Sequence, residues 1–426
     1  MLRASLAKPS PPVLRRCMTS LASKKEGDIS DAFTSLSGAQ REPLPDRYRQ
    51  LKLSLLQGRE DKIVRSWKKL LSELKRENEI VANKGPGVIP QIEFKDLERR
   101  NDTLREEVKK RGVVVVKGVI PEGEARAYKA EVEEYVARNP STRAFPPHDP
   151  QVYELYWSPP QLKARSHPNF LTVQHNLMSL WHTTTPTSIS LSQPFSYADR
   201  LRIRQPGDAS FALGPHIDGG SVERWEPEGY GAGHVYDSIL QGNWESYDPW
   251  DASGRVDANV AGVDEHEPYE AWGGDVVGES AGEAFYGGAT PGTGQELTGE
   301  LHPHLELERT MVHVPEIQPG DFVAWHCDTI HSVDKVHAGT ADSSVLYIPI
   351  CPITAQNAEY MVRQREAFLR GTPGPDFPGG AGESGHVGRG TEDMLDGAAR
   401  RAMGLSALRT EGEGKVVEEA NRILGF

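Results

Sequence analysis

A histidine and an aspartate two positions apart, His216 and Asp218, form the pattern in this sequence with the clearest chemical meaning. They lie in the string GPHIDGG, residues 214–220. Side chains at positions i and i+2 of a β-strand point to the same side, so both can reach one metal ion. A motif this short is common by chance, and a metal site needs a third ligand from elsewhere in the chain.

His331 is the candidate for that third ligand. It closes the string PGDFVAWHCDTIH, residues 319–331, in which Pro-Gly-Asp predicts a turn and residues 322–325 predict a strand. Two histidines and one carboxylate leave coordination positions open, as in non-haem iron(II) oxygenases. The sequence therefore predicts that His216, Asp218 and His331 bind Fe(II) and form the catalytic centre.

Other histidines fit a metal site less well. His302 and His304 share the i, i+2 spacing but have no carboxylate beside them, so a loop is expected there. His337 follows the distal ligand and is a candidate hydrogen-bond partner of the ligands. Four more are interpreted as structural or surface residues because no strand alternation surrounds them: His148, His167, His175 and His182.

The elements that must position these residues begin with a helical region over residues 29–85, where apolar residues recur at helical spacing. The string GVVVVKGVI, residues 112–120, predicts a buried strand because consecutive valines favour sheets. The loop after it lacks a glycine-rich phosphate-binding fingerprint, which argues against a Rossmann unit. Further helices are expected over residues 104–110, 121–138, 171–181 and 355–369.

Short strands separated by turns follow this helical part. They are expected from about residue 188 and over residues 201–204, 310–314, 322–325 and 345–350. This order indicates an α+β protein with a double-stranded β-helix core (a jelly roll of the cupin type) between N-terminal and C-terminal helices. The expected parts are a basic tail over 1–28, a helical extension over 29–100, a jelly-roll domain over 101–400 and a C-terminal tail or helix over 401–426.

One segment of the expected jelly-roll domain has an unusual composition. Residues 251–300 hold eleven glycines and eleven acidic residues but a single basic residue, Arg255. Such a stretch supplies little apolar surface for a sheet core. We expect a long loop or insertion.

Charge and composition exclude several classes of protein. The net charge of -13 argues against binding to nucleic acid, where affinity comes largely from Lys and Arg. No apolar run is long enough to cross a bilayer, and three widely spaced cysteines form neither a disulfide framework nor a zinc motif. The expected location is the cytoplasm. The mitochondrion is an alternative, because the first 25 residues are basic and contain no acid.

Four long strings carry a resemblance to a known family: GPHIDGGSVERW, PHLELERTMVHVPEIQPGDFVAWHCDTIHSVDKVH, SSVLYIPICP and RQREAFLRGTPGPDFPGG. They resemble the family of domain of unknown function 1479, found in fungi and bacteria, from about residue 29 to residue 400. The family is regarded as a distant relative of the Fe(II)/2-oxoglutarate dioxygenases. The resemblance implies a double-stranded β-helix core and places His216, Asp218 and His331 in the facial triad.

Many 2-oxoglutarate enzymes carry an arginine about ten residues after the distal histidine, where it binds the far carboxylate of the cosubstrate. Residues 339–344 here contain no basic residue. Arg202 and Arg204, on the strand before the His-x-Asp motif, and Lys335 are the candidates for this role.

The predicted function is therefore a dioxygenase that uses Fe(II), 2-oxoglutarate and dioxygen to hydroxylate a small molecule. Two alternatives stay open. One is a cupin-like metal enzyme that does not use 2-oxoglutarate, favoured by the missing downstream arginine. The other is a non-catalytic protein that binds a small acid, favoured by the glycine-rich segment. The sequence names neither the substrate nor the oligomeric state.

Overall fold

The computed structural model describes residues 44–99, 101–184, 189–209, 212–218, 221–231, 234–255, 294–377, 379–412 and 414–426. The basic tail over residues 1–28 and most of the glycine-rich segment lie outside these ranges. Among the residues that are described, no helix combines the length and the apolar character needed to span a membrane.

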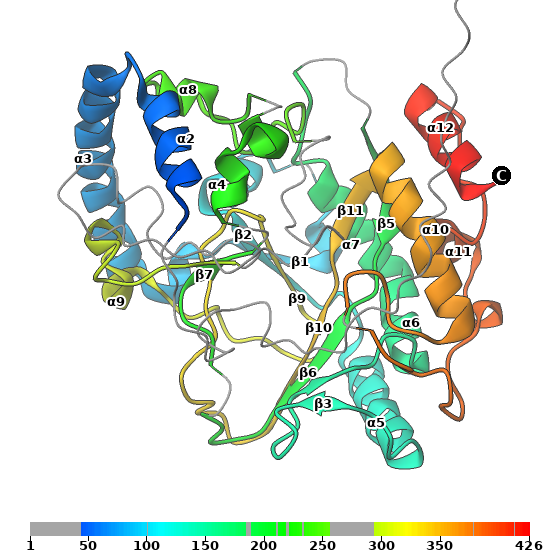
Figure 1. Ribbon diagram of the computed structural model, residues 1–426. Coiled ribbons are helices and arrows are strands. Elements are labelled where there is room, and N and C mark those ends of the chain that lie inside the picture. The colour runs from blue at the N-terminus through cyan, green and yellow to red at the C-terminus, as the bar shows by residue number, and fades with distance from the viewer. Residues whose placement is uncertain are drawn as a thin grey trace, which may run out of the picture.

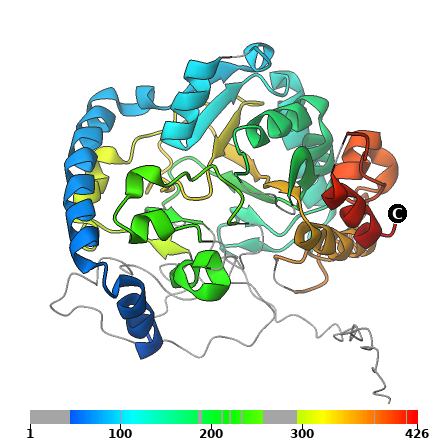
Figure 2. The ribbon, with the colours of Figure 1, turned by 90° about the horizontal axis from the view of Figure 1, so that it is seen from above.

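Two helices occupy the described part of the predicted helical region, and residues 29–43 of that region lie outside the described residues. The two helices are α2 (Asp46–Leu56) and the long α3 (Glu60–Lys84). One side of α3 contacts η8 (Pro303–Leu305) and α9 (Leu307–Thr310). There the ring of Trp67 meets the ring of His304 edge-on, with centroids 5.0 Å apart. Figures 1 and 2 both place α3 at one side of the molecule and the C-terminal helices at the other.

The valine-rich strand is the centre of the first sheet. This strand, β2 (Val113–Lys117), pairs in parallel with β1 (Gln91–Glu93) and antiparallel with β9 (Phe322–Trp325). Helices α4 (Asp102–Arg111) and α5 (Glu122–Arg138) flank β2 in the chain, and α7 (Pro168–Met178) supplies Phe170 and Val173 to the same core. Val114, Val115 and Val116 are fully or nearly buried, as their β-branched, apolar character favours.

The second sheet has the order β10-β6-β4-β3. Strand β6 (Arg200–Arg204) pairs antiparallel with β10 (Ser343–Tyr347), so that Arg202 lies opposite Val345. Leu201 and Ile203 face the core, where they pack against Tyr135 and Leu155. Because side chains alternate along a strand, the three arginines of β6 lie on the other face of this sheet.

Two smaller sheets complete the described strands. Strand β11 (Ile350–Ile353) pairs with β5 (Ser190–Ser196), and β7 (His216–Ile217) pairs with β8 (Gln295–Glu296). The remaining short elements are β3 (Ala144–Phe145), β4 (Val152–Tyr153), η2 (Gly85–Val88), η3 (Phe94–Asp96), η4 (Val222–Trp225), η5 (Pro227–Gly231), α8 (Asp237–Leu240), η6 (Trp244–Ser246) and η9 (Glu392–Met394).

The C-terminal part packs against β5 and β11. It contains α10 (Ala355–Arg370), α11 (Gly397–Ala402) and α12 (Lys415–Leu424), which are grouped together in Figure 1. Glu383, in the segment between α10 and α11, links that segment to residues 135–157. Its buried carboxylate accepts hydrogen bonds from the backbone amides of Tyr156 and Trp157, both at 2.7 Å, and from the hydroxyl of Tyr135 at 3.0 Å.

The α+β class is confirmed, and some expected elements need correction. Residues 310–314 are not a strand, because α9 ends at Thr310 and irregular chain follows. The strand expected over 345–350 is two strands, with Pro349, which has no amide to donate, between them. Helix α6 (Pro159–Ser166) was not expected in a proline-rich region. The described strands form four sheets of two to four strands, so the double-stranded β-helix remains a prediction.

Candidate metal centre

Two of the three predicted ligands face each other across a backbone bridge. The amide of His216 donates to the carbonyl of His331 at 2.9 Å, and the amide of His331 donates to the carbonyl of His216 at 3.0 Å. Residues paired in this way project their side chains to the same side. Their ring centroids are 4.2 Å apart.

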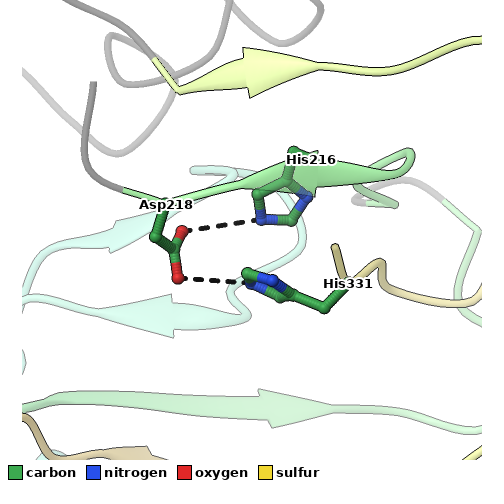
Figure 3. Close-up of side chains that lie close together, drawn as sticks. All are labelled: His216, Asp218 and His331. Atoms are coloured by element: carbon green, nitrogen blue, oxygen red, sulfur yellow. Dashed lines mark ion pairs between the residues drawn. The ribbon is translucent and has the colours of Figure 1, made fainter. Parts of the chain in front are cut away.

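Asp218 completes the group from the bend that follows β7. One carboxylate oxygen lies 3.7 Å from Nε2 of His216, and the other lies 3.3 Å from Nε2 of His331 (Figure 3). The three ligand atoms all fall within 4.8 Å of one another. The structure therefore brings together the triad that the sequence predicted, from two segments more than a hundred residues apart.

The tautomers of both histidines are set by the backbone. Nδ1 of His216 donates to the carbonyl of Gly214 at 2.8 Å, and Nδ1 of His331 donates to the carbonyl of Thr329 at 3.0 Å. In the neutral form of each ring, Nε2 therefore carries no proton, and it points toward Asp218, as a metal ligand requires. Two neutral imidazoles and a carboxylate form a donor set that fits a divalent ion such as Fe(II).

Burial and mutual charges shift the pKa values of this group. Burial lowers the pKa of His216, and the neighbouring His331 lowers it further. Burial would raise the pKa of Asp218, but the hydrogen bond and charge of His331, together with a bond from Trp325, lower it. Burial would lower the pKa of His331, but Asp218 outweighs that effect and raises it. The triad thus favours an ionised carboxylate.

The turn that carries His331 is braced by His326. The amide of His326 donates to the carbonyl of Gly112 at 2.7 Å, and its ring stacks on Trp181 with centroids 4.7 Å apart. Nδ1 of His326 accepts from the amide of Asp328 at 3.0 Å, while Nε2 donates to the carbonyl of Pro249 at 3.0 Å. His326, Cys327 and Asp328 also lie close enough to share an ion. Both ring nitrogens of His326 are already used, so this second cluster fits a metal poorly.

Three further residues lie beside the triad, and two of them, Arg224 and Asp328, were not predicted from the sequence. Trp325 packs against the ring of His331 with centroids 5.1 Å apart and helps to lower the pKa of the Asp218 carboxyl. Arg224 donates to the backbone carbonyl of Asp218 and forms an ion pair with Asp328 at 2.6 Å. The sequence did offer one signal for this pair: Arg224 and Asp328 carry opposite charges, and each lies close to one part of the predicted triad.

The candidates for cosubstrate binding lie in different settings. Arg202 is buried in β6 and donates to Gln151 at 3.4 Å. Arg204, also buried, forms a 2.6 Å ion pair with Asp208. Lys335 is exposed in the chain between His331 and β10.

His337, expected as a hydrogen-bond partner of the ligands, instead has its ring Nε2 at 2.9 Å from the carbonyl of Ala341. His302 and His304 flank the start of η8, in agreement with an irregular segment.

Comparison with known proteins assigns the chain to a family. The sequence pattern of the Gig2-like family matches residues 42–268 and 275–405. The chain belongs to the Gig2-like family. This confirms the resemblance to the family of domain of unknown function 1479, because the similar structure of GlcNAc Inducible Gene 2 from Candida albicans carries that family description. The relation of the family to the dioxygenases stays a prediction.

Relatives of the Gig2-like family cover most of the chain. The Candida albicans structure is 25% identical, has a TM-score of 0.75, and is matched over 91% of this chain and 96% of its own. The uncharacterized protein YbiU of Escherichia coli K12 is 28% identical over 367 residues, which are 75% of this chain and 86% of YbiU. A Salmonella typhimurium LT2 structure, described as a candidate oxidoreductase, is 24% identical with a TM-score of 0.69, over 85% of this chain and 99% of its own.

Proposed function

We propose that this Gig2-like protein is a non-haem Fe(II) dioxygenase that uses 2-oxoglutarate to hydroxylate a small molecule. The observation that carries the proposal is the converging triad of His216, Asp218 and His331. Both histidines present Nε2 to the same point, and the carboxylate faces them. Two histidines and one carboxylate occupy three coordination positions and leave the others open for cosubstrate and dioxygen.

Iron(II) held in this way would supply the oxidation chemistry, coupling conversion of 2-oxoglutarate and dioxygen to succinate and carbon dioxide with hydroxylation of a C–H bond. The chain contributes the ligands and their orientation. Trp325, on the strand that leads to the distal histidine, contacts the triad and is 38% exposed. It is suited to form the wall of a substrate site beside the metal.

Arg202 is the best-supported candidate for binding the far carboxylate of 2-oxoglutarate. It lies on the face of the second sheet away from the core, opposite Val345 of β10, the strand that follows the distal histidine. On this face Arg202 is 4% exposed, and Val345 and Tyr347 of the neighbouring β10 are 39% and 37% exposed. Arg204 is less suited because Asp208 already compensates its charge.

A metal enzyme that does not use 2-oxoglutarate is the second candidate. Two of the three candidates for binding the 2-oxoglutarate carboxylate are poorly suited, because Arg204 is paired with Asp208 and Lys335 is exposed. Use of 2-oxoglutarate therefore depends on Arg202, and this observation favours the second candidate. Under this alternative the same triad binds the metal.

The test is an anaerobic titration of the metal-free protein with Fe(II) and then with 2-oxoglutarate, followed by visible absorption. We expect a charge-transfer band that requires both additions and is absent in His216→Ala. His313→Ala is the matched control, because this histidine is exposed and pairs only with the exposed Asp334 among the contacts described for it.

The outcomes separate the candidates. Iron binding without a band after addition of 2-oxoglutarate would reject the cosubstrate and favour the second candidate. Failure of the wild-type protein to bind iron at all would reject both. A band that survives in His216→Ala would mean that the metal is bound elsewhere.

A further inference from the structure

Arg224 and Asp328 connect the two chain segments that carry the metal ligands. Arg224 lies in η4, six residues after Asp218, and Asp328 lies three residues before His331. Nη1 of Arg224 donates to the Asp328 carboxylate at 2.6 Å, while Nη2 donates to the backbone carbonyl of Asp218. One guanidinium thus bridges both segments.

The two histidines and the aspartate differ in how their backbones are held. His216 and His331 fix each other through paired backbone hydrogen bonds. Strand β7 ends at Ile217, so Asp218 lies just beyond the pairing with β8. Asp218 is therefore the candidate ligand outside the described strand pairing, and the contact from Arg224 holds its backbone.

The bridge is rigid because its acidic partner is fixed from several sides. The second carboxylate oxygen of Asp328 accepts from Nη2 of Arg255 at 2.7 Å, and the amide of Asp328 donates to His326. The side chains of Arg224 and Arg255 are each only 9% exposed. Buried, charge-assisted hydrogen bonds of this kind are strong and directional.

We propose that Arg224, fixed by Asp328, is a positioning residue that holds Asp218 in register with the two histidine ligands. The proposal rests on the proposed metal site. Neither side chain is assigned as a ligand. Hydrogen-bond partners that orient metal ligands typically account for a tenfold to hundredfold change in metal affinity, which sets the scale of the expected effect.

The experiment measures Co(II) affinity and the Co(II) visible spectrum of the metal-free protein and its variants. Arg224→Gln should lower Co(II) affinity by about 10-fold or more and alter the spectrum. Asp328→Asn should also lower the affinity, and the double variant should lose less than the product of the two single effects, because both act through one contact. Arg224→Lys keeps the charge beside Asp328 but cannot bridge both segments, so it should not restore wild-type affinity.

Arg365→Gln is the matched control. Arg365 also bridges two chain segments through backbone carbonyls, those of Gly404 and Leu424, but it does so between α10 and the C-terminal end. It should leave Co(II) affinity within about twofold of the wild type, even if it lowers the melting temperature of the metal-free protein.

Wild-type Co(II) affinity and spectrum in folded Arg224→Gln would overturn the positioning role while leaving the metal site intact. If the glutamine variant does not fold, Arg224→Lys carries the test, and wild-type affinity in that variant has the same meaning. A wild-type protein that binds no Co(II) would instead overturn the proposed function, and the positioning role with it.

Discussion

Each candidate ligand histidine donates a hydrogen bond from Nδ1 to the carbonyl two residues earlier in the chain, that of Gly214 for His216 and that of Thr329 for His331. The orientation of both rings is thus a local property of the chain. The backbone of Asp218 is instead held by Arg224, six residues further on, and Arg224 is paired with Asp328, a residue far away in the sequence.

Asp328 should make the stability of the protein depend on acidity. Burial alone would raise the pKa of Asp328, but the charges of Arg255 and Arg224 hold it well below its usual range. A carboxylate with a lowered pKa in the folded state contributes stability above its unfolded pKa of about 4, and that contribution is lost as the pH falls through the lowered value. Urea unfolding at pH 7, 4 and 3 should show a smaller loss of unfolding free energy in Asp328→Asn than in the wild type. Equal losses in the two proteins would show that this pair adds nothing to acid sensitivity.

Arg202→Gln should weaken cosubstrate binding. Loss of a charge-assisted bond to a carboxylate costs about 1.5–3 kcal/mol, or about tenfold to hundredfold in the 2-oxoglutarate concentration at half saturation. The measurement is the same absorption titration, at saturating iron. Lys335→Gln serves as the control at an exposed position. The reverse pattern, with only the lysine variant impaired, would transfer the role to Lys335.

At the scale of elements, a tight turn fixes where β9 begins. Gly320 has a φ of +94°, and a Cβ atom at this position would lie 1.9 Å from the carbonyl oxygen of Ile120. Asp321 then accepts from the amides of Gly118 and Gln318. The turn thereby joins β9 to the end of β2 and sets the start of the segment that leads to His331.

Gly320→Ala should destabilise the protein by about 1–3 kcal/mol, because a non-glycine residue is strained at this φ and its side chain meets the backbone. Chemical unfolding gives the free energy. Gly299→Ala is the control, since its added Cβ would meet nothing within 4 Å and its φ is not in the left-handed region. A Gly320→Ala protein as stable as the Gly299→Ala protein would show that the chain relaxes there without cost.

The elements predicted correctly from the sequence are those with strong local signals. Four consecutive valines marked β2, Pro-Gly-Asp marked the turn before β9, and helical spacing marked α3 and α10. The strand predicted over residues 310–314 was wrong, because apolar and polar residues also alternate there in the irregular chain that follows α9. His216 and Asp218 were recognisable as candidate ligands from their local i, i+2 spacing, and His331 from the turn and strand signals before it. Arg224 was missed because its role depends on contacts across about a hundred residues.

At the scale of the whole molecule, a buried carboxylate joins the C-terminal part to the centre. Glu383 accepts three hydrogen bonds from residues 135–157 and is fully buried. Burial raises the pKa of Glu383, and the amides of Tyr156 and Trp157 oppose that shift. Other hydrogen bonds join the same parts, among them those of the Val387 amide to Asn139 and of the Gly390 amide to the carbonyl of Trp157, but among these links Glu383 supplies the buried carboxylate.

Glu383→Ala should lower the free energy of unfolding by about 3 kcal/mol or more, because it leaves buried amide donors unsatisfied. Glu383→Gln should cost less, since its amide oxygen can still accept from both backbone amides. Denaturant unfolding of the two variants gives the comparison. Equal losses would indicate that the charge of Glu383, and not its acceptor atoms, provides the stabilisation.

Because His216 and His331 are joined by two backbone hydrogen bonds, exchange of their amide protons would measure how often the candidate site opens. Each amide proton is held by the carbonyl of the other residue, so neither can be released while the two segments stay together. Deuterium uptake at these two amides should therefore rise and fall in step, and any ligand that closes the segments should slow both. The integrity of the site can thus be followed without turnover and without knowing the substrate.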